Sequence, residues 1–156
     1  MKTLGNILWW LAFVYAAIAL QAFVPSVDVL TCGVILLLQE RDYHNMLWFL
    51  PLCILLQEGM GTRLFGAAIL WYATVILFFN AGRWLFEAKN FLFVFLLSAC
   101  LGVAFYGLNW ILAPLQNIDF DPQEALNASL LQAVLIPCIW WVLTYARRWH
   151  TAPRDS

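Results

Sequence analysis

The chain has 156 residues, of which 64% are hydrophobic and only 11% are charged, and its mean hydropathy is +0.81. A soluble domain carries about a quarter charged residues, because charge covers a surface that faces water, so this composition argues against a soluble protein. The formal net charge of −1 gives no support to nucleic-acid binding, which requires a basic face. We therefore expect one integral membrane domain over residues 1–156.

The first apolar segment, Ile7–Val24, follows Lys2 and resembles a secretory signal at first sight. It is long for a signal core, however, and it ends in Phe23-Val24-Pro25-Ser26 without a small-x-small cleavage pattern. Further apolar segments follow at once. We expect it to be a retained transmembrane helix, about the length that crosses 30 Å of hydrocarbon.

Two shorter apolar runs follow, separated by the polar sequence from Gln39 to Asn45. A re-entrant hairpin would place Glu40, Arg41 and Asp42 at mid-membrane, at roughly 2.5–3.5 kcal/mol for each charge. Two short spans, Ser26–Arg41 and Tyr43–Glu58, would instead leave these charges in water. We expect the two short spans, with the bilayer locally thinned around them.

Three more segments complete a predicted all-α fold of six transmembrane helices. They are Leu64–Phe79, Asn90–Leu112 and Ala125–Tyr145. In lipid every backbone polar group must be satisfied within the segment, which favours helices over single strands. With the N-terminus inside, seven Lys and Arg residues fall on the cytoplasmic side and Arg63 alone falls outside. The positive-inside rule then predicts that both termini are cytoplasmic.

The densest polar stretch at membrane depth runs from Gln57 to Arg63. We expect a tight turn in which Gly59 and Gly61 supply positive φ angles and Glu58 pairs with Arg63. The plain interpretation is a loop with interfacial charges. The alternative is a ligand or partner site at the outer face.

Asp28 precedes the second predicted helix, where a carboxylate caps the helix and complements its dipole. Asp28 and Glu58 should lie at the same membrane face, and two carboxylates can serve in acid–base chemistry. However, His44 and His150 fall at the opposite face, and no nucleophile accompanies the pair. We expect no enzymatic activity, cofactor or metal.

Small residues four positions apart allow helices to approach closely in a bilayer. Ala12 and Ala16 form such a pair in the first helix, and Ser98 and Gly102 form one in the fifth. These two pairs are the predicted partner-binding residues.

From Pro25 to Arg148 the chain resembles the MreD family of bacterial rod-shape (elongasome) proteins. The resemblance rests on Val24-Pro25-Ser26-Val27-Asp28, a short apolar run closing near Arg41, and the stretch from Leu55 to Gly66. Family members usually have Asp where this chain has Glu58. The resemblance implies a scaffold in the bacterial cytoplasmic membrane that binds an MreC-like protein and works with MreB, RodA and a class B penicillin-binding protein.

The family fold is similar to that of the substrate-binding subunits of energy-coupling-factor transporters, which supplies an alternative function. Such a subunit would bind a vitamin at the outer face, near the loops after the first, third and fifth helices. Those loops offer Asp28, Gln57, Glu58 and Arg63 as hydrogen-bonding groups. We expect the scaffold function and keep the vitamin-binding subunit as the alternative.

Overall fold

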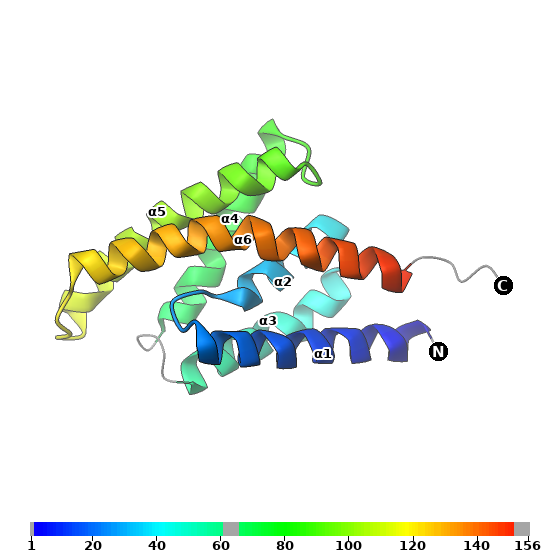
Figure 1. Cartoon of the computed structure of the whole chain (residues 1–156), viewed down its shortest axis with the longest axis horizontal. Coiled ribbons are helices and arrows are strands. Elements are labelled where there is room, and N and C mark those ends of the chain that lie inside the picture. Colours follow the sequence, from blue (N-terminus) through cyan, green and yellow to red (C-terminus); the bar gives the residue numbers. More distant parts are fainter. Residues whose placement is uncertain (1, 61–65, 152–156) are drawn as a thin grey trace.

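The computed structural model describes residues 2–60 and 66–151, with side chains from Leu4 onward, and these residues form an all-helical protein. Six helices account for nearly all of the described chain (Figure 1). Their bounds are α1 Lys2–Phe23, α2 Val29–Glu40, α3 Tyr43–Gly59, α4 Ala67–Leu85, α5 Phe91–Leu115 and α6 Pro122–Thr151.

The short helix α2 lies in the middle of the fold (Figure 1). Every residue from Val29 to Gln39 is buried, so this helix has no face left for solvent or lipid. Asp28 caps its N-terminus by accepting from the backbone N–H of Thr31, as the sequence predicts. At its C-terminus Arg41 adopts a left-handed conformation, with φ 55°, which ends the helix before α3 begins.

Helices α1 and α3 pack against α2 through aromatic side chains. The buried hydrophobic residues of α1 are Trp10, Phe13, Val14 and Ala17, a spacing that places them on one side of a helix. The Phe13 and Phe49 rings come close at Gly33 of α2, where an added Cβ would lie 2.4 Å from one ring and 2.9 Å from the other. Gly33 therefore permits the close approach of three helices.

Helices α5 and α6 pack closely against each other. A Cβ on Gly102 would lie 3.0 Å from the Ser129 carbonyl oxygen and 3.1 Å from the Ala133 Cβ. Helix α6 also reaches α2, since the Cys32 thiol lies 3.7 Å from the Ile136 carbonyl oxygen.

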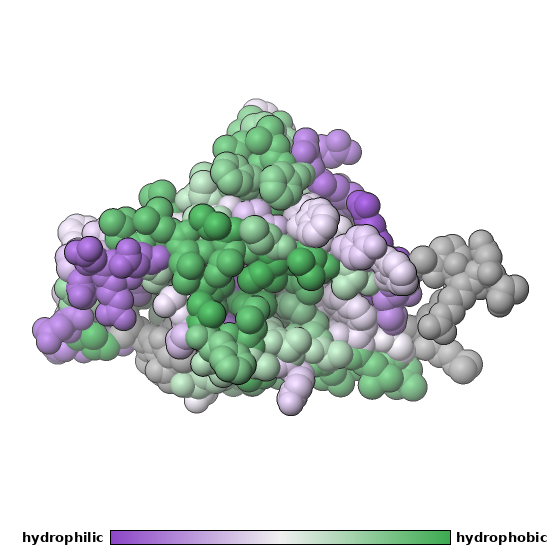
Figure 2. Space-filling model, viewed as in Figure 1, coloured by the Kyte–Doolittle hydropathy of each residue, from purple (hydrophilic) through white to green (hydrophobic). Residues whose placement is uncertain are grey.

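Four of the six helices, α1, α4, α5 and α6, are long and apolar enough to cross a membrane. Large hydrophobic side chains remain exposed along them, and Figure 2 shows an apolar surface over α5 and α6 between hydrophilic groups at the two ends of the molecule. These features indicate a membrane protein. The expected spans Ser26–Arg41 and Tyr43–Glu58 do form two helices, but α2 has 12 residues and α3 has 17, about 18 and 26 Å of helix. Length and composition therefore support four crossings.

Consecutive helices run in alternating directions, as the side-chain contacts between their ends show. Hydrogen bonds to Asp28 join the end of α1, the start of α2, the end of α3 and the start of α4. At the opposite end Glu40 of α2 pairs with Arg147 of α6, and Gln39 contacts the connection before α5. Arg147 also lies 4.9 Å from the Trp9 ring centroid, so α1 begins where α6 ends.

Candidate functional site

The most distinctive polar site surrounds the carboxylate of Asp28, which is fully buried, with a relative exposure of 0%. Asp28 stands in the extended backbone that joins α1 to α2, with φ −89° and ψ 91°. Its position before Val29 lets it cap α2 while its side chain faces α1, α3 and α4. We call Asp28 and its donors the Asp28 cluster, which consists of Gln21, Asp28, Thr31, Gln57, Trp71 and Tyr72.

Both oxygens of Asp28 accept several hydrogen bonds. Oδ1 accepts from Gln57 Nε2 at 2.7 Å, from Gln21 Nε2 at 3.3 Å and from the Thr31 backbone N–H at 3.3 Å. The Tyr72 hydroxyl is at 3.4 Å from the same oxygen. Oδ2 accepts from the Thr31 hydroxyl at 2.8 Å and from Trp71 Nε1 at 3.0 Å.

Each donor comes from a defined helix end. Gln21 lies in the last turn of α1 and Gln57 in the last turn of α3, while Trp71 and Tyr72 lie in the first turns of α4. The Trp71 indole N–H is shared, since it also lies 2.9 Å from the Thr31 hydroxyl oxygen. Four helices therefore converge on one carboxylate.

The donor set suits a carboxylate, which accepts hydrogen bonds at both oxygens and donates none. A charged side chain at membrane depth is costly, and such residues usually mark functional sites or tightly paired networks. The arrangement can hold four helix ends in register. For acid–base catalysis it offers no accompanying histidine, since His150 lies beside Trp9 at the other end of the fold, with ring centroids 6.4 Å apart.

The expected turn after α3 differs from the sequence interpretation. Gly59 is the last residue of α3 and needs no positive φ; among the glycines that the structure describes, the left-handed one is Gly66, with φ 77°. Glu58 Oε1 accepts from the Gly66 backbone N–H at 3.1 Å, which links the end of α3 to the start of α4. Gly61 and Arg63 lie outside the described residues, so the Glu58–Arg63 ion pair stays a prediction. Within the expected cluster, Gln57 rather than Glu58 reaches Asp28.

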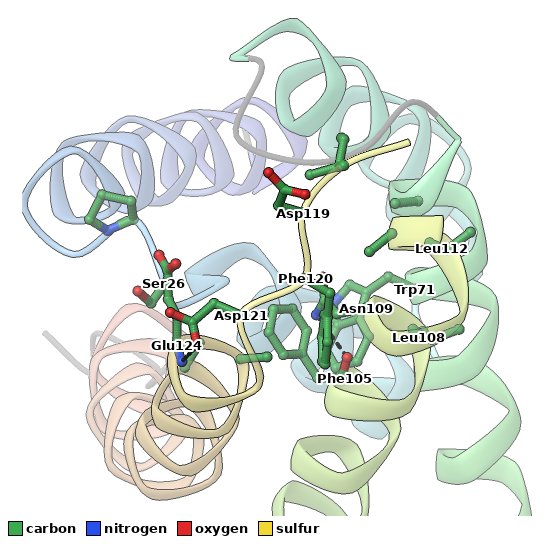
Figure 3. A pocket seen from close by; sticks show the side chains of 16 residues that line it. Ser26, Trp71, Phe105, Leu108, Asn109, Leu112, Asp119, Phe120, Asp121 and Glu124 are labelled. Carbon is green, nitrogen blue, oxygen red and sulfur yellow. Dashed lines mark hydrogen bonds between the residues drawn. The ribbon is translucent and has the colours of Figure 1, made fainter. Parts of the chain in front are cut away.

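A cavity of about 490 Å³ opens beside the Asp28 cluster (Figure 3). Trp71 lies in its wall with Phe105 and Phe120, and the Trp71 and Phe105 rings meet edge to face at 5.5 Å. Three carboxylates also line it, namely Asp119 and Asp121 from the α5–α6 connection and Glu124 from the first turn of α6. Asp121 is partly committed, because its Oδ1 accepts from the Gln123 backbone N–H at 2.9 Å and so caps α6. The walls of the cavity are mixed, because aromatic and aliphatic side chains share them with three carboxylates, Asn109 and Ser26.

A second polar group secures the other end of α2. Gln39 donates to the Ala88 carbonyl oxygen at 2.5 Å and accepts from Trp140 Nε1 at 2.7 Å. Glu40 accepts from Arg147 Nε at 3.1 Å and Nη2 at 3.2 Å, a two-pronged pair. Both ends of the central helix are therefore held by polar contacts to other helices.

The predicted partner-binding pairs separate into two kinds. Ala12 and Ala16 are exposed on α1 and are free to meet another helix. Ser98 and Gly102 are buried, and Gly102 faces Ser129 and Ala133 of α6. Assigning Ser98 and Gly102 to an external partner is therefore corrected: their small size lets α5 and α6 pack together inside the chain.

Sequence reasoning missed most donors of the Asp28 cluster. Gln21 and Thr31 carry a signal, because a polar residue in an apolar helix needs a partner and Thr31 sits three residues after a helix-capping Asp. Trp71 and Tyr72 carry none, since aromatic residues are common in such helices. Gln132 was also missed; it is fully buried in α6, and its side-chain amide meets no hydrogen-bond partner among the described residues.

The chain matches no protein-family model, no curated protein and no solved structure.

Proposed function

We propose that this protein is an MreD-type scaffold of the bacterial rod-shape complex, resident in the cytoplasmic membrane. In this role it binds an MreC-like partner and works with MreB, RodA and a class B penicillin-binding protein to organise lateral wall synthesis. It acts by holding other membrane proteins in place and not by catalysis.

One observation carries the proposal. Two of the segments that carry the resemblance are one ending in Asp28 and one containing Gln57 and Glu58. These segments meet in the fold through the buried 2.7 Å hydrogen bond from Gln57 to Asp28. The two segments therefore have a physical reason to occur together, because their residues form one buried contact between helices. The Asp28 cluster contains this contact, which supports treating the pattern as a family trait.

We further propose six crossings, in a fold like that of energy-coupling-factor binding subunits, with both termini in the cytoplasm. The alternating helix directions support six crossings, because α2 and α3 each connect the two polar ends of the molecule. A buried α2 needs no match to lipid thickness, since its neighbours are protein. The end at which Arg41, Arg83, Lys89, Arg147 and Arg148 lie would face the cytoplasm.

The partner surface in this proposal is the outer face of α1 that carries Ala12 and Ala16. Both residues are exposed, beside large exposed side chains such as Leu8, Leu11 and Tyr15. A single anchoring helix of an MreC-like protein can approach closely where the side chains are small.

Co-purification of an MreC-like partner from membranes tests this surface. Ala16→Leu should abolish recovery of the partner, whereas Ala99→Leu, the same change at an exposed position of α5, should leave it intact. Retained binding by Ala16→Leu would show that the α1 face is not the interface. Cells depleted of the protein should lose their rod shape, and normal rods would refute the scaffold function.

The cavity beside Trp71 favours a second candidate, a vitamin-binding subunit of an energy-coupling-factor transporter. It is lined by Pro25 and Ser26 after α1 and by residues 118–121 after α5, the loops that would hold such a ligand. Tight binding of a vitamin by the purified protein, together with a nutrient-uptake defect in normally shaped cells, would favour this candidate over the scaffold.

A further inference from the structure

A cavity of about 530 Å³ lies at the end of the molecule opposite Asp28. It is formed by the end of α2, the end of α4 and the connection that leads to α5. Three basic residues, Arg41, Arg83 and Lys89, contribute to its lining. Its volume falls within the range of about 300–1,000 Å³ that is typical of small-ligand sites.

None of these three basic side chains forms a hydrogen bond or an ion pair within the described parts of the chain. The floor of the cavity is nevertheless fixed. Gln39 is buried, and both ends of its amide are used by Ala88 and Trp140. The cavity is therefore a defined space with unpaired cations at its edge.

The charge balance of the cavity favours an anion. Of its two carboxylates, Glu40 is neutralised by Arg147, so only Glu87 opposes the three cations. Helices α2 and α4 end here and add about half a negative charge each, while the start of α5 adds about half a positive charge. The sum remains positive by more than one charge, so an anionic group is attracted.

The surroundings favour an anion that is carried by a lipid. Trp84 and Leu85 follow Arg83 directly and are exposed by 87% and 68%. Phe91 and Leu92 follow Lys89 closely and are exposed as well. Hydrophilic groups at this end lie beside an apolar surface (Figure 2). A headgroup in the cavity would have acyl chains beside these apolar side chains, as at other interfacial lipid sites.

We propose that this cavity binds the phosphate headgroup of an anionic phospholipid, with Arg41, Arg83 and Lys89 as its cationic contacts. The site goes beyond the scaffold function and does not depend on it. It gives the protein a preference for anionic lipid at one defined position, separate from the Asp28 cluster and the α1 face.

The test is lipid binding to the purified full-length protein in detergent, measured by native mass spectrometry with phosphatidylglycerol and with zwitterionic phosphatidylcholine. Phosphatidylglycerol should bind more tightly. Arg83→Gln and Lys89→Gln should each weaken it about fivefold, the effect expected for one basic residue at a lipid surface. The matched control Arg148→Gln removes an equal charge from an exposed position of α6 outside the cavity and should leave affinity unchanged.

Glu87→Gln provides a test in the opposite direction, which holds even if an arginine variant folds poorly. Removing this carboxylate should strengthen phosphatidylglycerol binding about fivefold. Equal losses of phosphatidylglycerol affinity in Arg148→Gln and Arg83→Gln would show that general surface charge is responsible, and would overturn the proposed site. Displacement of the lipid by free inorganic phosphate at a comparable concentration would overturn the assignment to a lipid. Unchanged affinity in Arg83→Gln, Lys89→Gln and Glu87→Gln would refute the proposal outright.

Discussion

Replacing Asp28 by leucine tests whether the Asp28 cluster holds the helix ends together. The substitution removes the one acceptor that Gln21, Thr31, Gln57, Trp71 and Tyr72 share. Some of these donors keep another acceptor. Gln21 Nε2 also donates to the Val27 carbonyl oxygen at 3.3 Å, and Trp71 Nε1 also donates to the Thr31 hydroxyl oxygen.

The expected loss is the balance of two opposing terms. Apart from the Tyr72 hydroxyl, whose 3.4 Å bond is the longest and is left out of the sum, three donors would lose their acceptor. They are Gln57 Nε2 and the backbone N–H and hydroxyl of Thr31, at about 1–3 kcal/mol each, or about 6 kcal/mol together. Removing a fully buried carboxylate returns about 3 kcal/mol of desolvation. We therefore expect Asp28→Leu to lower the free energy of unfolding by about 3 kcal/mol. Asp28→Asn should lower it by about 1–2 kcal/mol, because the amide keeps one acceptor but turns a donor toward other donors.

The assay is reversible unfolding in mixed micelles with increasing denaturing detergent, followed by circular dichroism. Asp119→Leu is the matched control, since Asp119 is exposed and accepts no hydrogen bond among the described residues, and it should change stability by less than about 0.5 kcal/mol. A gain in stability from Asp28→Leu would show that desolvation of the carboxylate outweighs its hydrogen bonds. A value equal to that of the control would show that the cluster does not hold the helix ends.

Three further predictions address packing, the second polar end and topology. Gly33→Ala should lower the free energy of unfolding by about 1–3 kcal/mol, because its Cβ would overlap Phe13. Gly59→Ala, with open space around it, should be neutral or stabilising by up to about 1 kcal/mol. The same micelle assay measures both variants, and equal effects would contradict the close packing at Gly33. Glu40→Leu should destabilise the protein by about 2 kcal/mol, less than for a fully buried ion pair because Glu40 is partly exposed. The double variant with Arg147→Leu should lose less stability than the sum of the two single variants. Additive losses would show that Glu40 and Arg147 do not interact. A reporter active only outside the cytoplasmic membrane should be active when fused at Gln116 and inactive at Ser156, and the reverse pattern would overturn the charge-based orientation.

The helices themselves are largely predictable from the sequence, because apolar length and the rule that lipid forbids unpaired backbone leave little choice. The two short helices were also separated correctly at Arg41 and Asp42, since charges there favour a turn in water. What the sequence does not reveal is that α2 is buried on all sides. Burial among other helices and exposure to lipid select the same apolar residues, so composition cannot distinguish them. The same ambiguity holds for the four cysteines, which all lie in apolar runs: Cys32 and Cys53 are buried, whereas Cys100 and Cys138 are exposed.

For the candidate site, the sequence draws attention to single residues but not to the contacts between them. Asp28 and Gln57 stand out in the sequence because polar residues are rare at membrane depth. Their direct contact spans 29 positions of the chain, which no local pattern encodes. The contact of Gln57, and not Glu58, with Asp28 cannot be deduced without the angle at which α3 meets α2. The same holds for the positive φ angle at Gly66 in place of Gly59. Small residues mislead for a similar reason: Gly102 and Ala16 fit the same spacing rule, yet one faces α6 and the other is exposed.

The polar contacts at the two ends of α2 explain how a short apolar helix keeps one position. Apolar side chains alone discriminate weakly between positions along the helix axis, because neighbouring helices and lipid are equally apolar. A slip by one turn, about 5.4 Å, would take Asp28 out of reach of Gln57 and would also separate Glu40 from Arg147. Both contacts resist a slip in either direction. Helix α2 therefore fixes α1, α3, α4 and α6 relative to one another without using their outer faces, so these faces can exchange lipid for a protein partner while the interior stays unchanged.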